Sequence, residues 1–306
     1  MSVVHRLTVE NYRSIRKLSV PLRRLNVFVG ENGAGKTNLY RALELIQAAA
    51  LGTLTRELAA EGGMESAFWA GDRKAKDPVR IKLGCELGEG AGLVRQTVEL
   101  GVKTPTGAGF LLEPQIKLER LEHLTARRPV TLLKRQNMSV QACDREGKLK
   151  DLDLDLLPSE TALSAIRDPG EFPDLAFARD HMTAWRFHHS FRTDAGSPLR
   201  RPCLAITTPT LAPDGADLAA VFATLAHIRQ DTADLDAAVA DAFDDARLAI
   251  PEPGRTASFG VVHPDFPKRV FDAAELSDGT LRFLALAGAL FGYRPASFIA
   301  LNEPET

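Results

Sequence analysis

The 306-residue sequence has few cysteines, no long hydrophobic run and almost no net charge. Cys85, Cys143 and Cys203 are far apart and match neither a metal-binding nor a disulfide spacing, which predicts reduced thiols. No segment approaches the roughly 18 consecutive apolar residues of a membrane-spanning helix. The N-terminal residues also lack the apolar segment of a signal peptide. These absences predict a cytoplasmic protein with no membrane segment.

The composition is close to that of an average globular protein, with 44% hydrophobic, 25% charged and 7% aromatic residues. It excludes a disordered chain, a collagen-like chain and a long coiled coil. The net charge of −2 hides an uneven distribution, because residues 1–41 are rich in Lys and Arg whereas residues 211–250 are rich in Asp. The basic start favours an anionic ligand or a nucleic acid there. Ordinary scatter of surface charge is the alternative, especially for the acidic section.

The hydrophobic pattern predicts strands at both ends of the chain and helices in its later half. Short turn-separated β-type segments in the first half favour an antiparallel meander at about residues 76–145. An Ala-rich helical section follows from residue 159 to about 245, with Asp217 and Asp234 as candidate N-caps. The expected strands are 3–10, 11–22, 25–30, 78–86, 93–102, 109–118, 130–143 and 297–301, and the expected terminal helices are 36–52 and 277–292.

The strongest motif is GENGAGKT at residues 30–37, which fits the phosphate-binding pattern G-x-x-x-x-G-K-[ST] between a predicted strand and a predicted helix. Glycines let the backbone N–H groups of such a loop converge on phosphate oxygens, and the helix adds the positive end of its dipole. Lys36 would reach the β- and γ-phosphates, and the Thr37 hydroxyl would bind Mg²⁺. The predicted nucleotide-binding residues are Gly30, Glu31, Asn32, Gly33, Ala34, Gly35, Lys36, Thr37 and Asn38.

Two weaker motifs follow near the other end. LSDGT at residues 276–280 places an N-cap, Ser277, and Gly279 at the start of an apolar helix, where backbone N–H groups can face an anion. An apolar strand then ends at Asn302 and Glu303, so that a carboxylate can orient the water that attacks a phosphate. Either motif alone is typical of ordinary helix starts and strand ends. Their order after the phosphate-binding loop is the informative feature.

The three motifs together resemble the Walker A, signature and Walker B motifs of ABC-type ATPase heads. Six segments resemble parts of the RecF/SMC-related predicted AAA-type ATPases: NYRSIRKLSVPLRRLNVFVGENGAGKTN, GGMESAFWAG, WRFHHSFR, SPLRRP, DGADLAAVFATL and ELSDGTLRFLALAGAL. The similarity extends over essentially the whole chain. The resemblance implies a head that binds ATP and Mg²⁺ and dimerises, with Ser277 and Gly279 contacting the γ-phosphate held by the partner's Lys36. It also implies that Glu303 is the general base and that Arg13 approaches the nucleotide.

Two departures from the family pattern affect this prediction. The family has Asp-Glu at the end of the Walker B strand, whereas this chain has Asn302-Glu303. An amide is a poorer partner than a carboxylate for Mg²⁺, so we expect weaker metal binding and slower hydrolysis. The resemblance also implies further segments, with a switch histidine, after Walker B, and so predicts a head truncated at its C-terminus. Neither Gln47 nor Gln96 can be assigned as a Q-loop residue.

The predicted fold class is α/β: a P-loop NTPase of the ABC/SMC-head type with an antiparallel meander and an inserted helical subdomain. The expected parts are an N-terminal half-head (1–150), the helical insertion (151–255) and a C-terminal half-head (256–306). Its central sheet would carry the Walker A and Walker B strands. The predicted function is an ATP-binding and ATP-hydrolysing dimerisation switch, linked by the resemblance to DNA repair or phage defence. The alternatives are a nucleotide-binding scaffold with little hydrolysis and, less favoured, a kinase-like phosphotransferase.

Possible partners are a second copy of the chain, an effector protein and DNA. The basic residues Arg127, Arg128, Lys134 and Arg135 would contact a nucleic-acid backbone without sequence specificity, although a solvated strand face fits them somewhat better. His188 and His189 fit a packed or surface pair better than a metal site, because no further ligand has a suitable spacing. Trp185 and Phe187 are expected in the core.

Overall fold

The computed structural model describes residues 3–72, 79–102, 110 and 112–304, and the chain divides into two compact units, Met1–Trp185 and Arg186–Thr306. Residue 78 of the predicted strand 78–86, and residues 109 and 111 of the predicted strand 109–118, lie outside the described residues. The predicted part boundaries at residues 150 and 255 do not coincide with the division between these units and stay predictions. Each unit is described by itself below.

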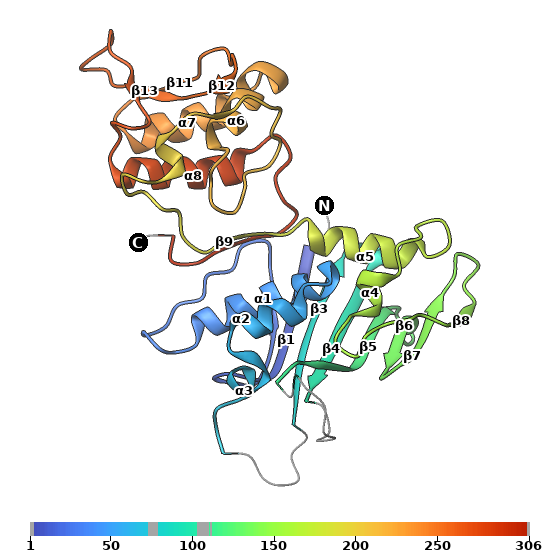
Figure 1. Cartoon of the computed structure of the whole chain (residues 1–306). Helices are drawn as coiled ribbons and strands as arrows, with labels where there is room; N and C mark the ends of the chain where they lie inside the picture. The colour runs from blue at the N-terminus through green and yellow to red at the C-terminus, as the bar shows by residue number, and fades with distance from the viewer. Residues whose placement is uncertain (1–2, 73–78, 103–109, 111, 305–306) are drawn as a thin grey trace. The chain divides into compact units, whose positions relative to one another are not determined.

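The first unit is built on an eight-stranded antiparallel sheet in the order β2-β1-β3-β4-β5-β6-β7-β8 (Figure 1). From β3 to β8 each strand pairs with the next along the chain, which confirms the predicted meander. The N-terminal hairpin joins the sheet through pairing of β1 with β3. The strands are β1 Val3–Tyr12, β2 Ile15–Pro21, β3 Arg80–Gly88, β4 Val94–Gly101, β5 Gln115–His123, β6 Val130–Gln136, β7 Ser139–Cys143 and β8 Leu149–Leu152.

One face of this sheet is covered by helices (Figure 1). Alternate residues of β3, including Ile81 and Leu83, are buried, as a strand with one covered face requires. Glu86, on the other face of β3, pairs with both Arg6 and Arg95, so charges of opposite sign neutralise one another along that face. The helices are α1 Lys36–Leu51, α2 Leu54–Ala60, α3 Gly63–Ala67, α4 Ala162–Ala165 and α5 Pro173–Thr183, with the short 3₁₀ helix η1 Gly90–Gly92.

The second unit packs helices and short strands around its own hydrophobic core. Helix α8 contacts α6 and α7. A Cβ atom at Gly288 of α8 would lie 2.3 Å from Leu218 Cδ1, so a larger residue there would force the Leu218 side chain to move. Phe222 and Phe259 meet edge to face in the core, with ring centroids 5.3 Å apart. The elements are β9 Arg186–His188, η2 Pro198–Arg200, β10 Cys203–Leu204, α6 Leu218–Ala223, the π-helix η3 Thr224–Arg229, α7 Ala233–Ala242, β11 Arg247–Ala249, β12 Thr256–Ala257, β13 Gly260–Val262, β14 Phe271–Asp272, α8 Asp278–Phe291 and β15 Ile299–Leu301.

Several predicted elements are confirmed. Helix α1 occupies the predicted span and ends at Gly52, whose left-handed backbone (φ 81°) forms the C-cap. Helix α8 begins after the predicted N-cap Ser277, and β15 follows at the predicted place. Trp185 and Phe187 are buried as expected.

Other predicted elements are wrong. The predicted strand at residues 25–30 does not form, and Leu25, Val27 and Val29 are 81%, 77% and 90% exposed. The segment has the composition of a strand, but a strand needs a hydrogen-bonded neighbour, and none of the strand pairs among the described residues includes this segment. The eight-stranded sheet therefore contains neither the Walker A segment nor the Walker B strand β15, which pairs with β9.

Three finer predictions also need correction. The predicted strand 130–143 is a hairpin, because Asn137 adopts a left-handed backbone (φ 54°) that turns the chain between β6 and β7. Helix α7 begins after Thr232, so Asp234 lies in its first turn and is not its N-cap. Asp217 is at the N-cap position of α6, but its carboxylate accepts the N–H of Ala212 instead of capping the helix.

Candidate functional site

The phosphate-binding motif lies in the first unit as an exposed loop that leads into α1. Gly33 (φ 82°) and Gly35 (φ 98°) are both left-handed, and Gly35 is the N-cap of α1 without any side-chain capping bond. The first N–H groups of a helix have no partner within the helix, and the helix dipole makes them attractive to an anion. The loop and α1 therefore present the local geometry expected of a phosphate site.

Lys36 is folded back over this loop. Its ammonium group donates to the carbonyl oxygens of Gly30 (2.5 Å) and Glu31 (3.2 Å), while the N–H of Ala34 donates to Glu31 at 3.1 Å. The Thr37 side chain is exposed in the first turn of α1. A hydroxyl oxygen is a ligand of the type that Mg²⁺ binds, so this residue fits the predicted metal role.

A serine that the sequence analysis did not assign contacts the same loop. The Ser14 hydroxyl, in the β1–β2 turn, accepts a hydrogen bond of 2.8 Å from Asn38, and it would lie only 2.6 Å from a Cβ atom at Gly35. It belongs to the NYRSIR segment on which the family resemblance rests, so the signal was present in the sequence. Asn38 thus lies beside the loop with its amide N–H group bonded to Ser14, and its predicted contact with a nucleotide stays a prediction.

Arg13, predicted to approach the nucleotide, is paired within the first unit. Its guanidinium group lies 2.8 Å from the Glu61 carboxylate, which also accepts the Tyr12 hydroxyl at 2.8 Å. Burial and the neighbouring Glu61 raise the pKa of Tyr12, so this hydroxyl stays protonated and donates. In this arrangement Arg13 fixes the turn beside the loop, and its predicted contact with a nucleotide stays a prediction.

The signature residues lie at the start of α8 in the second unit. Ser277 caps the helix by accepting the N–H of Thr280 at 3.1 Å, and Ser277 and Gly279 are both exposed. Arg200 supports this turn, since it donates to the Leu276 carbonyl and to the Asp278 carboxylate, each at 2.7 Å. Arg200 lies in the SPLRRP segment and was not singled out as a functional residue.

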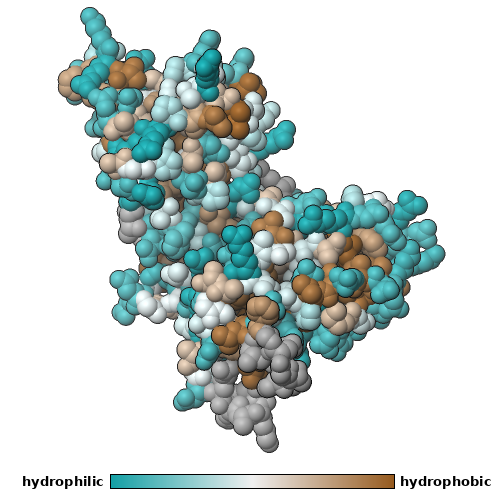
Figure 2. All heavy atoms as spheres, viewed as in Figure 1, coloured by the Kyte–Doolittle hydropathy of each residue, from teal (hydrophilic) through white to brown (hydrophobic). Residues whose placement is uncertain are grey.

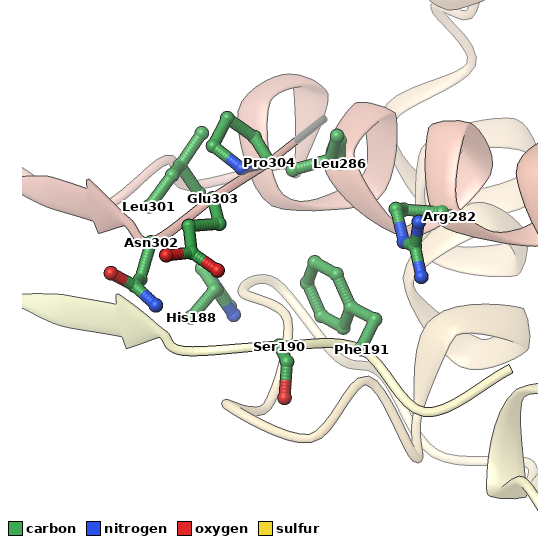
Figure 3. A pocket seen from close by; sticks show the side chains of 9 residues that line it. All are labelled: His188, Ser190, Phe191, Arg282, Leu286, Leu301, Asn302, Glu303 and Pro304. Atoms are coloured by element: carbon green, nitrogen blue, oxygen red, sulfur yellow. The ribbon is translucent and has the colours of Figure 1, made fainter. Parts of the chain in front are cut away.

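The Walker B residues follow β15, which pairs in parallel with β9. The Asn302 N–H donates to the His188 carbonyl at 3.1 Å, so the ends of the two strands are tied together. Glu303 has a left-handed backbone (φ 46°), an uncommon conformation for a residue other than glycine. Asn302, Glu303 and His188 line one pocket together with Arg282 of α8, and the Glu303 carboxylate and the His188 ring both face it (Figure 3).

The predicted site residues are thus distributed over both units. Gly30–Asn38 and Arg13 belong to the first unit, whereas Ser277, Gly279, Asn302 and Glu303 belong to the second. Their roles as a single nucleotide site stay predictions.

The basic run proposed for DNA does not form one exposed patch. Arg135 is fully buried and donates to the backbone carbonyls of Asn137, Leu157 and Glu160, so it supports the fold and cannot reach a nucleic acid. Arg127 and Arg128 are exposed in the loop before β6. In the view of Figure 2, hydrophilic residues are spread over both units and hydrophobic ones lie among them in small groups.

No group of three or more His, Cys, Asp or Glu side chains within residues 3–72, 79–102, 110 and 112–304 gathers as a metal site. In the same part of the chain, no helix has both the length and the apolar character needed to cross a bilayer.

A glycine-rich loop that carries its lysine into a helix, within a mixed α/β chain, defines a P-loop domain. A family model described as "AAA domain, putative AbiEii toxin, Type IV TA system" matches residues 25–306, and the chain belongs to this family. Among solved structures it is similar to "Crystal structure of the SmcHead bound to the C-winged helix domain of ScpA", with a TM-score of 0.41, 13% identity, and coverage of 94% of this chain and 74% of that one. No curated protein is significantly similar.

Family membership agrees with the predicted AAA-type class and with the α/β P-loop fold class. It does not show whether this chain is similar to RecF in particular, so that part of the prediction stays open.

Proposed function

We propose that this protein binds ATP with Mg²⁺ and hydrolyses it. The observation that carries the proposal is the loop at residues 30–37, where Gly35 leaves the start of α1 without a side-chain cap and Lys36 lies folded over the loop. Because a phosphate is a stronger partner for an ammonium group than a carbonyl, Lys36 would exchange its contacts with Gly30 and Glu31 for the β- and γ-phosphates. Membership in an AAA family supports this assignment.

In the proposed reaction, each residue has a separate task. The loop N–H groups and Lys36 neutralise charge that develops on the phosphates. Thr37 and Asn302 would hold Mg²⁺, which would supply further positive charge against the phosphates. Glu303 accepts the proton of the attacking water. Asn302 offers a neutral oxygen where a carboxylate would attract Mg²⁺ more strongly, so we expect slow turnover.

ATP binding is tested by titrating a fluorescent ATP analogue into the wild type, Lys36→Ala and Lys17→Ala. The Lys17 side chain is 75% exposed on β2, so its substitution removes the same charge outside the loop at residues 30–37. We expect Lys36→Ala to weaken binding at least tenfold and Lys17→Ala to leave it unchanged. Equal affinity of all three proteins would contradict the proposal.

We further propose that two copies close on the nucleotide through Ser277 and Gly279, as an ATP-dependent switch. Both residues are exposed at a supported helix start, which is available to a second molecule. Ser277→Asp preserves an N-cap but adds a negative charge that repels phosphate. We expect light scattering to show an ATP-dependent dimer for the wild type and a monomer for Ser277→Asp. A wild-type monomer in every nucleotide state would refute the switch.

We also propose that the protein contacts DNA, which would link it to DNA repair or phage defence. Burial of Arg135 leaves Arg127 and Arg128 as the exposed remainder of the basic run, so any DNA contact there would be weak and directed to phosphates. Salt-dependent binding that is lost in Arg127→Ala/Arg128→Ala would support it. The alternative, a nucleotide-binding scaffold, is favoured by Asn302 and predicts ATP binding without turnover.

A further inference from the structure

His188 was expected to be a packed or surface residue, yet the fold places it beside the Walker B residues. It ends β9, and in the parallel pairing of β9 with β15 it lies opposite Leu301. The hydrogen bond from the Asn302 N–H to the His188 carbonyl holds Asn302, the residue after β15, against the end of β9. The side chain is 3% exposed and lines the same pocket as Glu303 (Figure 3).

The orientation of the His188 ring follows from its contacts. Nδ1 lies 3.2 Å from the Pro213 carbonyl oxygen, which can only accept, so Nδ1 carries the proton. Phe191 packs against the ring at a centroid distance of 5.0 Å. A neutral imidazole carries a single ring proton, which here lies on Nδ1. Nε2 is therefore a hydrogen-bond acceptor held in a fixed place.

The pocket is thus lined by two residues that can accept hydrogen bonds, His188 through its ring and Glu303 through its carboxylate. Two acceptors repel one another directly but are joined by a molecule that donates two hydrogen bonds, and water is the smallest such donor. The pocket, whose empty volume of about 250 Å³ includes open solvent, has room for one. A water that donates both protons keeps its oxygen lone pairs directed away from the two acceptors.

We propose that His188 is a second catalytic acceptor, which orients the attacking water together with Glu303. This inference rests on the proposed ATPase function and assigns a residue that the family resemblance did not. The water oxygen forms a bond to the γ-phosphorus atom while the bond from that atom to the β–γ bridging oxygen breaks, which yields ADP and phosphate. The transferred proton passes to Glu303, and His188 accepts a hydrogen bond without taking the proton.

Two substitutions separate the roles of the ring nitrogens. Asparagine places an N–H group near the position of Nδ1 and preserves the bond to Pro213, but it has no acceptor at the position of Nε2. Glutamine reaches the position of Nε2 with an amide oxygen. His189→Asn, at the exposed neighbouring position, is the matched control.

The experiment measures single-turnover ATP hydrolysis and the affinity for a fluorescent ATP analogue in the same preparations, whose folding is checked by circular dichroism. We expect His188→Asn to slow hydrolysis about tenfold with unchanged nucleotide affinity, because the lost contact is to water alone. His188→Gln should retain most of the rate, and His189→Asn should match the wild type. An unchanged rate in folded His188→Asn, or equal losses in the Asn and Gln variants, would overturn the inference.

A double-mutant cycle with Glu303→Gln gives a readout that a general structural role of His188 would not produce. If both residues hold one water, His188→Asn should cost little further rate once Glu303 has been replaced. Multiplied losses would contradict a shared water. Failure of the proposed function is distinguishable, because the wild type would then show no hydrolysis at all.

Discussion

Replacing Arg135 by methionine should destabilise the first unit strongly. The Arg135 side chain is fully buried, and it donates to the carbonyls of Asn137 (2.8 Å), Leu157 (3.0 Å) and Glu160. Methionine fills a similar volume but leaves these acceptors unpaired. It also removes the positive charge beside Glu119, which lies directly opposite Arg135 in the β5–β6 pairing and is buried too.

The expected loss is about 3–5 kcal/mol, the range found when one partner of a buried charge network is removed. Losses for the separate hydrogen bonds do not add, because the three carbonyls share one donor group. Against a typical stability of about 5–15 kcal/mol, this loss would shift the unfolding transition markedly.

Urea unfolding followed by tryptophan fluorescence is the appropriate assay, because both tryptophans, Trp69 and Trp185, belong to the first unit. Lys134→Met, at the half-buried neighbouring position on the same strand, should change stability by less than about 0.5 kcal/mol. A loss below about 1 kcal/mol for Arg135→Met, or equal losses for both variants, would refute this account of the arginine.

Three further predictions concern the phosphate loop, the Walker B strand and a buried carboxyl. Gly35→Ala should weaken binding of an ATP analogue at least tenfold, because its Cβ atom would lie 2.6 Å from the Ser14 hydroxyl at a left-handed backbone position; unchanged affinity would argue against the loop geometry. Asn302→Asp should speed Mg²⁺-dependent hydrolysis, and equal turnover of the two proteins would refute the role given to the amide. Burial raises the pKa of Glu119 to about 7 from an ordinary 4.5, against the lowering effect of the Ala162 and Leu163 N–H groups and Arg135. Its protonated form therefore stabilises the fold below about pH 4.5, and this contribution is lost as the pH rises through about 7. Relative to Glu119→Gln, the wild type should lose about 2 kcal/mol of stability between about pH 5 and pH 8 in urea unfolding, and parallel pH profiles would contradict the assignment.

Local sequence signals predicted the elements whose structure depends on neighbours along the chain. The meander, α1 with its Gly52 cap and α8 with its Ser277 cap follow from turn residues, periodicity and capping, all of which are local. The strand predicted at residues 25–30 was wrong, because such a segment forms a strand only where another strand pairs with it.

The functional residues show the same division. The loop at Gly30–Thr37 is contiguous and was found directly, whereas His188 joins Glu303 only through the pairing of β9 with β15, residues more than a hundred positions apart. In the sequence, Arg135 is indistinguishable from the other basic residues of its strand. Its burial depends on the carbonyl groups of Leu157 and Glu160, which the fold brings within hydrogen-bonding distance.

The central claim, that this chain hydrolyses ATP through Lys36 and Glu303, is tested most directly by phosphate release in a single turnover. Wild type, Lys36→Ala and Glu303→Gln would be mixed with limiting ATP and Mg²⁺. The account predicts slow release by the wild type, ATP binding without release by Glu303→Gln, and weakened binding with no release by Lys36→Ala. Retained binding with no release by the wild type would contradict it and favour the scaffold.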